Sequence, residues 1–175
     1  MIEYWGVGVS INMLEKIVSG GQTGVDRAAL DAAMALGIEV GGWCPRGRRA
    51  VDGIIPAKYP LTETPDEAYQ TRTRWNVRDS DATLIVCRDE PSGGTALTIE
   101  YCEQLGRPFE VYQLKGGEII GLDGPDSYPT GVLYWLNCHD IKVLNVAGPR
   151  EGKFCPIHDR AYSFLCELFK LAQNS

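Results

Sequence analysis

The sequence has 175 residues, of which 44% are hydrophobic and 23% are charged, and its formal net charge is −6. This length suits one domain with a full hydrophobic core, so neither metal ions nor disulfides are needed for folding. The acidic total argues against a broad electrostatic grip on nucleic acid, although a local basic pocket is compatible with it.

The first predicted unit is a strand, a glycine loop and a helix. The strand covers residues 16–18 and the loop residues 19–24. Small and apolar residues then recur at helical spacing on one face, namely Val25, Ala28, Ala29, Ala32, Ala33 and Leu36. Gly37 is expected just beyond the end of this helix, and residues 38–40 begin a second strand.

A long loop follows the second strand. It contains the arginine-rich stretch 43–49 and runs through Pro60. The sequence Thr-Pro-Asp-Glu at 64–67 then predicts a capping box, with Thr64 as the N-cap of a helix that runs to about residue 79.

The rest of the chain repeats the alternation of strands and helices. A near-continuous apolar run at 82–87 is typical of a central parallel strand. The elements that follow are a helix ending at Gly106, a strand at 109–112, a short helix at 132–138, a strand at 143–146 and a last helix whose apolar stripe is Ala161, Phe164, Leu165, Leu168 and Ala172. This order predicts an α/β fold with a mainly parallel central sheet flanked by helices.

The six cysteines include no C-x-x-C pair. Cys87, Cys102 and Cys166 lie in apolar stretches, where cysteine usually acts as a small hydrophobic residue. A disulfide framework or a structural zinc site is therefore disfavoured, and reduced thiols in the cytosol fit better.

The chain contains no run of 18 apolar residues, and its start lacks the charged and apolar regions of a signal peptide. We therefore expect a cytoplasmic protein without a membrane partner. Residues 1–12 are expected to be a loose extension or a product of start-site choice, and residues 13–175 to form a single ligand-binding domain.

Three glycine-containing loops follow predicted strands, at 19–24, 92–95 and 148–150. The carboxyl ends of parallel strands meet at one edge of a sheet, where ligands bind. Glycine allows close backbone approach, and helix N-termini present N–H groups to anions. We predict a composite phosphate site with the first two loops as cradles and Arg46 and Arg150 as charged walls. Plain turns and solvated arginines remain the alternative.

Other reactive groups are sparse. Asp26 falls in the first turn of a helix, where the helix dipole favours a carboxylate without any catalytic role. Asp81 is the other obvious carboxylate, and His139 and His158 are the only histidines. No Ser/His/Asp or Cys/His set and no metal-ligand spacing can be assembled, so no catalytic residue and no side-chain metal site is predicted.

Five sequence blocks resemble the molybdenum cofactor carrier protein family. They are residues 19–33, 41–53, 72–85, 92–95 and 145–150, and they stand in the same order as in the family. The resemblance covers about residues 15–172. This family is part of a broader, Rossmann-like group, a circularly permuted nucleotide-binding superfamily that includes lysine-decarboxylase-like proteins and cytokinin-activating phosphoribohydrolases.

The resemblance implies a three-layer Rossmann-like fold, a homo-oligomer (a tetramer or a dimer), and storage or delivery of molybdenum cofactor to molybdoenzymes without catalysis. That cofactor is a pterin with a terminal phosphate and a dithiolene-bound molybdenum oxide. The residues that the loops and the resemblance together assign to cofactor binding are Gly20, Gly21, Gln22, Thr23, Gly24, Asp26, Arg27, Pro45, Arg46, Gly47, Arg72, Asn76, Arg78, Ser92, Gly93, Gly94, Thr95, Gly148, Pro149 and Arg150.

One departure from the broader group favours a binder. The phosphoribohydrolases carry Pro-Gly-Gly-Gly-x-Gly-Thr-x-x-Glu, with a catalytic glutamate three residues after the threonine. Here the loop 92–95 ends in threonine, but Thr98 stands at the glutamate position and Glu100 comes two residues too late. An enzyme acting on a nucleotide or ADP-ribose-type ligand, with Asp26, Glu100 or Arg78 in the chemistry, remains an alternative. A ligand sensor that signals through oligomer contacts is another.

Overall fold

The computed structural model describes residues 14–115, 118–121, 130–153 and 156–174. The predicted extension at 1–12 lies outside them. The strands of the central sheet are β1 (Lys16–Val18), β2 (Glu39–Gly41), β7 (Ala82–Cys87), β8 (Phe109–Lys115), β9 (Glu118–Gly121) and β10 (Val143–Ala147). Their order across the sheet is β2-β1-β10-β7-β8-β9. Only the β8–β9 pair is antiparallel among these neighbours, so the predicted mainly parallel sheet is confirmed.

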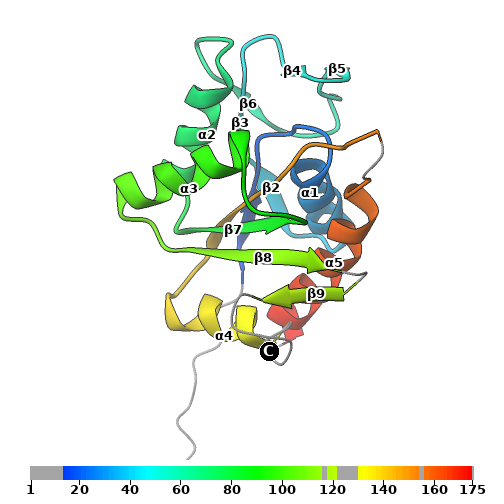
Figure 1. Ribbon diagram of the computed structural model, residues 1–175, viewed down its shortest axis with the longest axis vertical. Coiled ribbons are helices and arrows are strands. Elements are labelled where there is room, and N and C mark those ends of the chain that lie inside the picture. Colours follow the sequence, from blue (N-terminus) through cyan, green and yellow to red (C-terminus); the bar gives the residue numbers. More distant parts are fainter. Residues whose placement is uncertain (1–13, 116–117, 122–129, 154–155, 175) are drawn as a thin grey trace, which may run out of the picture.

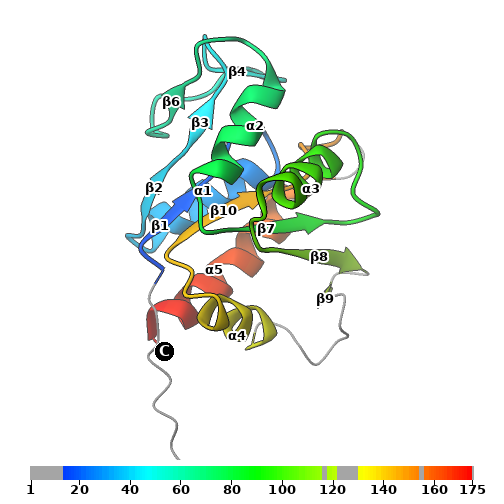
Figure 2. The same cartoon turned by 90° about the vertical axis from the view of Figure 1, so that its left-hand side faces the viewer.

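Helices cover both faces of the sheet. They are α1 (Val25–Ala35), α2 (Tyr69–Arg78), α3 (Gly93–Leu105), α4 (Thr130–Cys138) and α5 (His158–Asn174). Helices α1, α4 and α5 lie on one face and α2 and α3 on the other (Figure 1, Figure 2). The result is the three-layer, Rossmann-like α/β arrangement.

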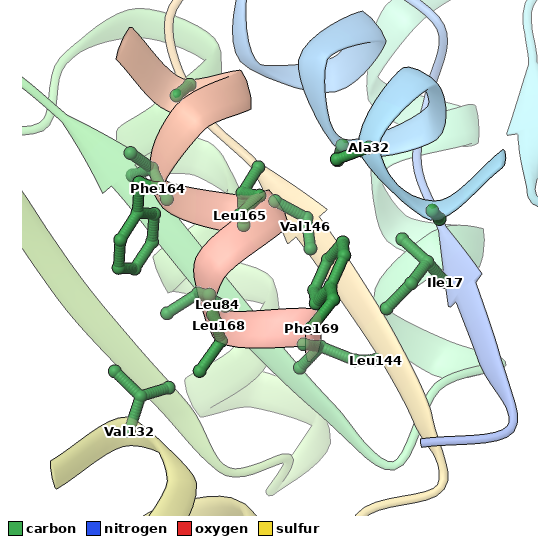
Figure 3. Close-up of a cluster of buried hydrophobic side chains, with 14 of the residues drawn as sticks. Ile17, Ala32, Leu84, Val132, Leu144, Val146, Phe164, Leu165, Leu168 and Phe169 are labelled. Carbon is green, nitrogen blue, oxygen red and sulfur yellow. The ribbon is translucent and has the colours of Figure 1, made fainter. Parts of the chain in front are cut away.

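The main core lies between the sheet and helices α1 and α5 (Figure 3). The predicted stripe of α5 is buried there, together with Phe169, which has no exposed surface. Side chains of β7 alternate between the layers, because Leu84 and Val86 join this core while Ile85 and Cys87 face α3. Fully buried alanines on α1 let that helix pack close to the sheet and α5.

The segment between β2 and α2 is more ordered than the predicted long loop. It contains the parallel pair β3 (Trp43–Cys44) with β6 (Thr62–Glu63) and the antiparallel hairpin β4 (Arg49–Ala50) with β5 (Gly53–Ile54). The guanidinium of Arg48 binds the segment together, since it donates to four backbone carbonyls, those of Ile55, Pro56, Tyr59 and Leu61. A small second core, which includes Leu30 of α1, lies beneath it.

The predicted helix start at Thr64 is wrong, because α2 begins at Tyr69 with Ala68 as its N-cap. The Thr64 hydroxyl lies 3.2 Å from the carbonyl oxygen of Cys44 and 2.9 Å from that of Asp66. Its backbone N–H also donates to the Cys44 carbonyl. The backbone of Thr64 therefore continues the pairing of β6 with β3, and the helix begins only at Tyr69.

Other sequence expectations concern cysteines and membrane spans. Within the described ranges, the cysteines are all free, namely Cys44, Cys87, Cys102, Cys138 and Cys166, while Cys155 lies outside those ranges. No described helix combines the length and the apolar character needed to cross a membrane.

Phe169→Ala should lower the free energy of unfolding by about 3–5 kcal/mol, because it removes a fully buried aromatic ring and leaves a cavity. Chemical denaturation followed by circular dichroism measures this loss. The matched control is Tyr134→Ala on α4, whose side chain is 73% exposed and whose removal should change stability by less than about 0.5 kcal/mol. Equal losses in the two variants would contradict the placement of the core.

Candidate functional site

The three glycine loops lie side by side at one edge of the sheet. Strands β1, β10 and β7 are parallel neighbours, so their carboxyl ends point the same way. The chain leaves β1 toward β2 on one side and β7 toward β8 on the other, which makes this edge a topological switch point. A pocket of about 560 Å³ opens here, a size suited to a small organic ligand.

The pocket brings together many of the predicted site residues. Those that line it are Gln22, Asp26, Arg72, Ser92, Gly93, Gly94, Thr95, Gly148, Pro149 and Arg150. Those that do not line it are Gly20, Gly21, Thr23, Gly24, Arg27, Pro45, Arg46, Gly47, Asn76 and Arg78. Other parts of the pocket wall come from the chain between β2 and α2 and from α2 itself.

The N–H groups of the first loop are largely used within the protein. The backbone N–H of Gln22 donates to the carboxylate of Asp26, and that of Thr23 donates to the side-chain oxygen of Gln22. The N–H of Val25 donates to the carbonyl of Pro149. A Cβ atom on Gly24, whose φ is +83°, would lie 2.5 Å from that same carbonyl oxygen. The loop therefore joins β1 and α1 to the β10 loop, and its role as a phosphate cradle stays a prediction.

A buried ion pair crosses beneath this loop. The Nη1 atom of Arg72 lies 3.1 Å from Oδ2 of Asp26, and the side chains are 15% and 4% exposed. A Cβ atom on Gly20 would lie 1.8 Å from the same Nη1, so only glycine leaves room for the guanidinium. Burial raises the pKa of Asp26, while Arg72 and the N–H of Gln22 oppose this rise. Within the described structure, Nε of Arg72 is buried without a hydrogen-bond partner.

The N-terminus of α3 is open toward the pocket. Ser92 is the N-cap residue, but no side chain caps this helix end in the part of the chain that the structure describes, and no acidic residue lies in the first turn. Gly93 and Gly94 are exposed, and a Cβ atom on either would meet no atom within 4 Å. The free N–H groups and the positive end of the helix dipole therefore face the cavity, where an anion would be stabilised.

Charged side chains surround this helix end. Arg88 and Arg150 line the pocket, and no described carboxylate forms an ion pair with Arg150. Asp89 and Glu90 contribute negative charge, although an oxygen of Glu90 lies 3.4 Å from the amide nitrogen of Gln113, in β8. The field at the pocket is therefore mixed, and its positive part is local to α3 and the arginines.

Among the described residues, Cys87 is the only cysteine that lines the pocket. Burial, helped by the nearby charges of Glu90 and Asp89, raises the pKa of its thiol to about 11. Cys87 is therefore a neutral thiol at pH 7 and a poor nucleophile or metal ligand. Among the described residues, no group of three or more His, Cys, Asp or Glu side chains is placed to hold a metal ion.

Several predicted binding residues have structural partners outside the pocket. Arg27 pairs with Asp52 in the β4–β5 turn through contacts of 2.6 and 2.8 Å. Arg46 is largely exposed and donates to the carbonyl of Pro65, so it does not form the predicted wall of this pocket.

Two residues of α2 also have such partners. The side-chain amide of Asn76 accepts a hydrogen bond from the N–H of Trp43 and donates one to its carbonyl. Arg78 pairs with Asp79 and lies over the ring of Trp75.

The pocket also contains residues that sequence reasoning did not assign to the site. These are Val51, Tyr69, Thr73, Cys87, Arg88, Asp89, Glu90, Pro91, Thr98, Ala147, Gly152 and Ile157. Thr98 occupies the position where the resemblance to phosphoribohydrolases would place a glutamate, and its hydroxyl donates to the carbonyl of Gly94 at 2.9 Å. Glu100 is exposed and does not line the pocket. Helix α3 therefore contributes no carboxylate to it.

A Rossmann-like α/β sheet with a pocket at its switch point defines the class of this protein. The model of the circularly permutated YpsA SLOG family matches residues 17–169, and the chain belongs to this family. The chain is also similar to a crystal structure from Syntrophus aciditrophicus SB named "Putative molybdenum carrier protein". The TM-score is 0.81 and the identity 41%, over 90% of this chain and 96% of that one. No curated protein matches significantly. The family resemblance seen in the sequence is thus confirmed.

Arg72→Met should destabilise the protein by about 3–5 kcal/mol at neutral pH, because it leaves Asp26 buried without its cation. The loss should grow as pH rises from about 4. Without Arg72 the folded-state pKa of Asp26 rises further, and stability is lost as pH rises through a raised folded-state pKa. Denaturation curves at several pH values measure this slope.

Arg46→Met is the matched control, since that side chain is 61% exposed and should change stability by less than about 0.5 kcal/mol at every pH. A loss for Arg72→Met that is independent of pH would show that Asp26 is not the group responsible.

Proposed function

We propose that this protein binds molybdenum cofactor in the pocket at the switch point and carries it without chemical change. The observation that supports this most directly is the uncapped N-terminus of α3, which opens into the pocket beside Arg150. Such a helix end suits the terminal phosphate of the pterin, and an arginine suits bidentate phosphate contact. The name of the similar Syntrophus structure, a putative molybdenum carrier protein, supports a cargo that contains molybdenum.

The cavity and its lining are compatible with the whole cofactor. A volume of about 560 Å³ exceeds what a phosphate alone needs and leaves room for the pterin. The described side chains include no cluster of metal ligands at the site, and the cofactor needs none, because its own dithiolene holds the molybdenum. The protein would then grip the organic part of its cargo and leave the metal to the cofactor.

The reactive groups of the pocket favour holding over reacting. Thr98 stands where the related hydrolases carry glutamate, and its hydroxyl is engaged with the Gly94 carbonyl. Cys87 is protonated at neutral pH. Asp26 is buried and paired with Arg72. A carrier also needs acceptors, and we propose molybdoenzymes in this role, with residues 13–175 as one binding domain in a cytoplasmic homo-oligomer.

One observation favours a second function, an enzyme that hydrolyses a nucleotide or ADP-ribose-type ligand. Asp26 is a buried carboxyl group with a raised pKa at the wall of a pocket, which is a common property of catalytic acids and bases. Incubation with a panel of nucleoside phosphates and ADP-ribose, with release of ribose or base as the signal, tests it. Turnover that Asp26→Asn abolishes, in a variant whose circular dichroism is unchanged, would favour the enzyme over the carrier.

Gly94→Asp should weaken binding of molybdopterin by at least about tenfold, because it places a carboxylate where the phosphate is expected to lie. The same carboxylate at a helix N-terminus is favourable to the helix, so the melting temperature should not fall. Gly94→Asn is the matched control, since it has nearly the same size without the charge. Both side chains enter open space, which separates charge from steric effects.

Fluorescence titration or calorimetry with molybdopterin gives the affinities, and transfer to a cofactor-free molybdoenzyme gives the delivery. The wild-type protein should retain the cofactor longer than an unrelated protein of similar size and pass it on without altering it. Absence of saturable binding, or equal affinities for Gly94→Asp and Gly94→Asn, would overturn the proposed function.

A further inference from the structure

The side of the pocket formed by the chain between β2 and α2 and by α2 itself carries two apolar or aromatic side chains beside Arg72 and Thr73. Tyr69, the first residue of α2, and Val51, in the β4–β5 turn, both line the cavity. They are 38% and 50% exposed, and few large apolar side chains among the described residues are as exposed. The polar groups at the α3 end therefore account for only part of the lining.

The Val51 side of the wall is fixed to the first glycine loop. The side-chain oxygen of Gln22 accepts hydrogen bonds from the N–H of Val51 at 3.1 Å and from that of Thr23 at 3.0 Å. The carboxylate of the next residue, Asp52, accepts hydrogen bonds from Nη1 and Nη2 of Arg27 on α1. The turn is thus held at two successive residues, and its apolar side chain is left pointing into solvent and the pocket.

The Tyr69 side of the wall is fixed through α2. The hydroxyl of Thr73 donates to the carbonyl of Tyr69 at 2.8 Å, and Arg72, one turn into the helix, is bound to the buried carboxylate of Asp26. No hydrogen bond of the tyrosine hydroxyl is present within the described residues. The ring is therefore positioned by its backbone and remains available to a ligand.

We propose that Tyr69 and Val51 form the subsite for the flat heterocyclic ring of a phosphate-bearing ligand, and that Gln22 is a positioning residue that holds Val51 in place. This inference rests on the proposed function, because it assumes that the phosphate lies at the N-terminus of α3. Covering the exposed Tyr69 ring and Val51 side chain with a planar ring removes apolar surface from water, which favours binding. Stacking on an aromatic face also accepts many kinds of planar ring. The subsite selects phosphates that carry a planar heterocyclic ring over phosphates that carry none.

The experiment compares two probes on the full chain, molybdopterin and ribose 5-phosphate, a sugar phosphate that carries no planar heterocyclic ring. Tyr69→Ala should weaken binding of the first about tenfold and of the second less than about twofold, because stacking of a ring on an aromatic side chain is worth about that factor. Tyr69→Phe should bind both like the wild type. Ile54→Ala is the control, since Ile54 is 75% exposed on the β4–β5 hairpin that carries Val51 but does not line the pocket.

The positioning role of Gln22 has its own readout. Gln22→Leu removes the acceptor for the Val51 N–H, so hydrogen exchange at that amide should speed up and the preference for molybdopterin over ribose 5-phosphate should fall. Gln22→Glu retains an acceptor oxygen and should restore the preference, although its charge weakens both probes alike. A merely structural role would move both affinities together and leave their ratio unchanged.

The outcomes separate the two proposals. If Gly94→Asp weakens both probes while Tyr69→Ala changes neither, or changes both equally, the phosphate site stands and the ring subsite is overturned. If neither probe binds the wild type, the proposed function fails and the ring subsite fails with it. A guanosine monophosphate that binds as well as molybdopterin, with the same dependence on Tyr69, supports a ring subsite that does not discriminate a pterin from a purine.

Discussion

The ion pair between Arg72 and Asp26 is the constraint on which the site depends. It joins α2, on one face of the sheet, to the first turn of α1, on the other face, across the backbone of Gly20. Neither charge is well solvated, so each needs the other, and loss of one partner leaves a costly buried charge. Because Tyr69 and Thr73 flank Arg72 on the same short helix, the pair also sets where α2 meets the pocket.

The glycine loops at 19–24 and 92–95 have different structural roles, although their sequences are alike. Both have the pattern of strand, glycines, small polar residue and helix. In the first loop the N–H groups and side chains are used by Asp26, Gln22 and the β10 loop, so the loop builds the floor. In the second, α3 begins without a cap and with two exposed glycines. Local bonds to Asp26 and Gln22 account for part of this difference. The other part depends on contacts with Val146 and Glu151, more than 120 residues away along the chain, which no local pattern encodes.

Sequence patterns predicted most elements of the sheet and of the layer formed by α1 and α5, because these elements carry apolar runs or apolar residues at regular spacing. The buried run of β7, the alanine face of α1 and the stripe of α5 all occur where helical or strand spacing placed them. The pairs β3–β6 and β4–β5 are too short to show any period. The segment that contains them is held by hydrogen bonds from the Arg48 guanidinium to four backbone carbonyls. Val51 lies in that segment and Tyr69 begins the helix that follows it, so the sequence predicted the glycine-loop side of the pocket and missed the side lined by these two residues.

The proposed grip on an anion must work in a protein whose net charge is −6. A site built mainly from arginines would need to overcome the surrounding negative field and the nearby Asp89 and Glu90. Backbone N–H groups at a helix end act only at close range, so they bind a phosphate that has already entered and do little to attract anions from solution. In the proposed carrier role, a site of this kind would also allow release of the cargo. The proposed ring subsite would add selectivity without charge, because Tyr69 and Val51 would distinguish a cargo with a planar ring from phosphates that share only its anionic end.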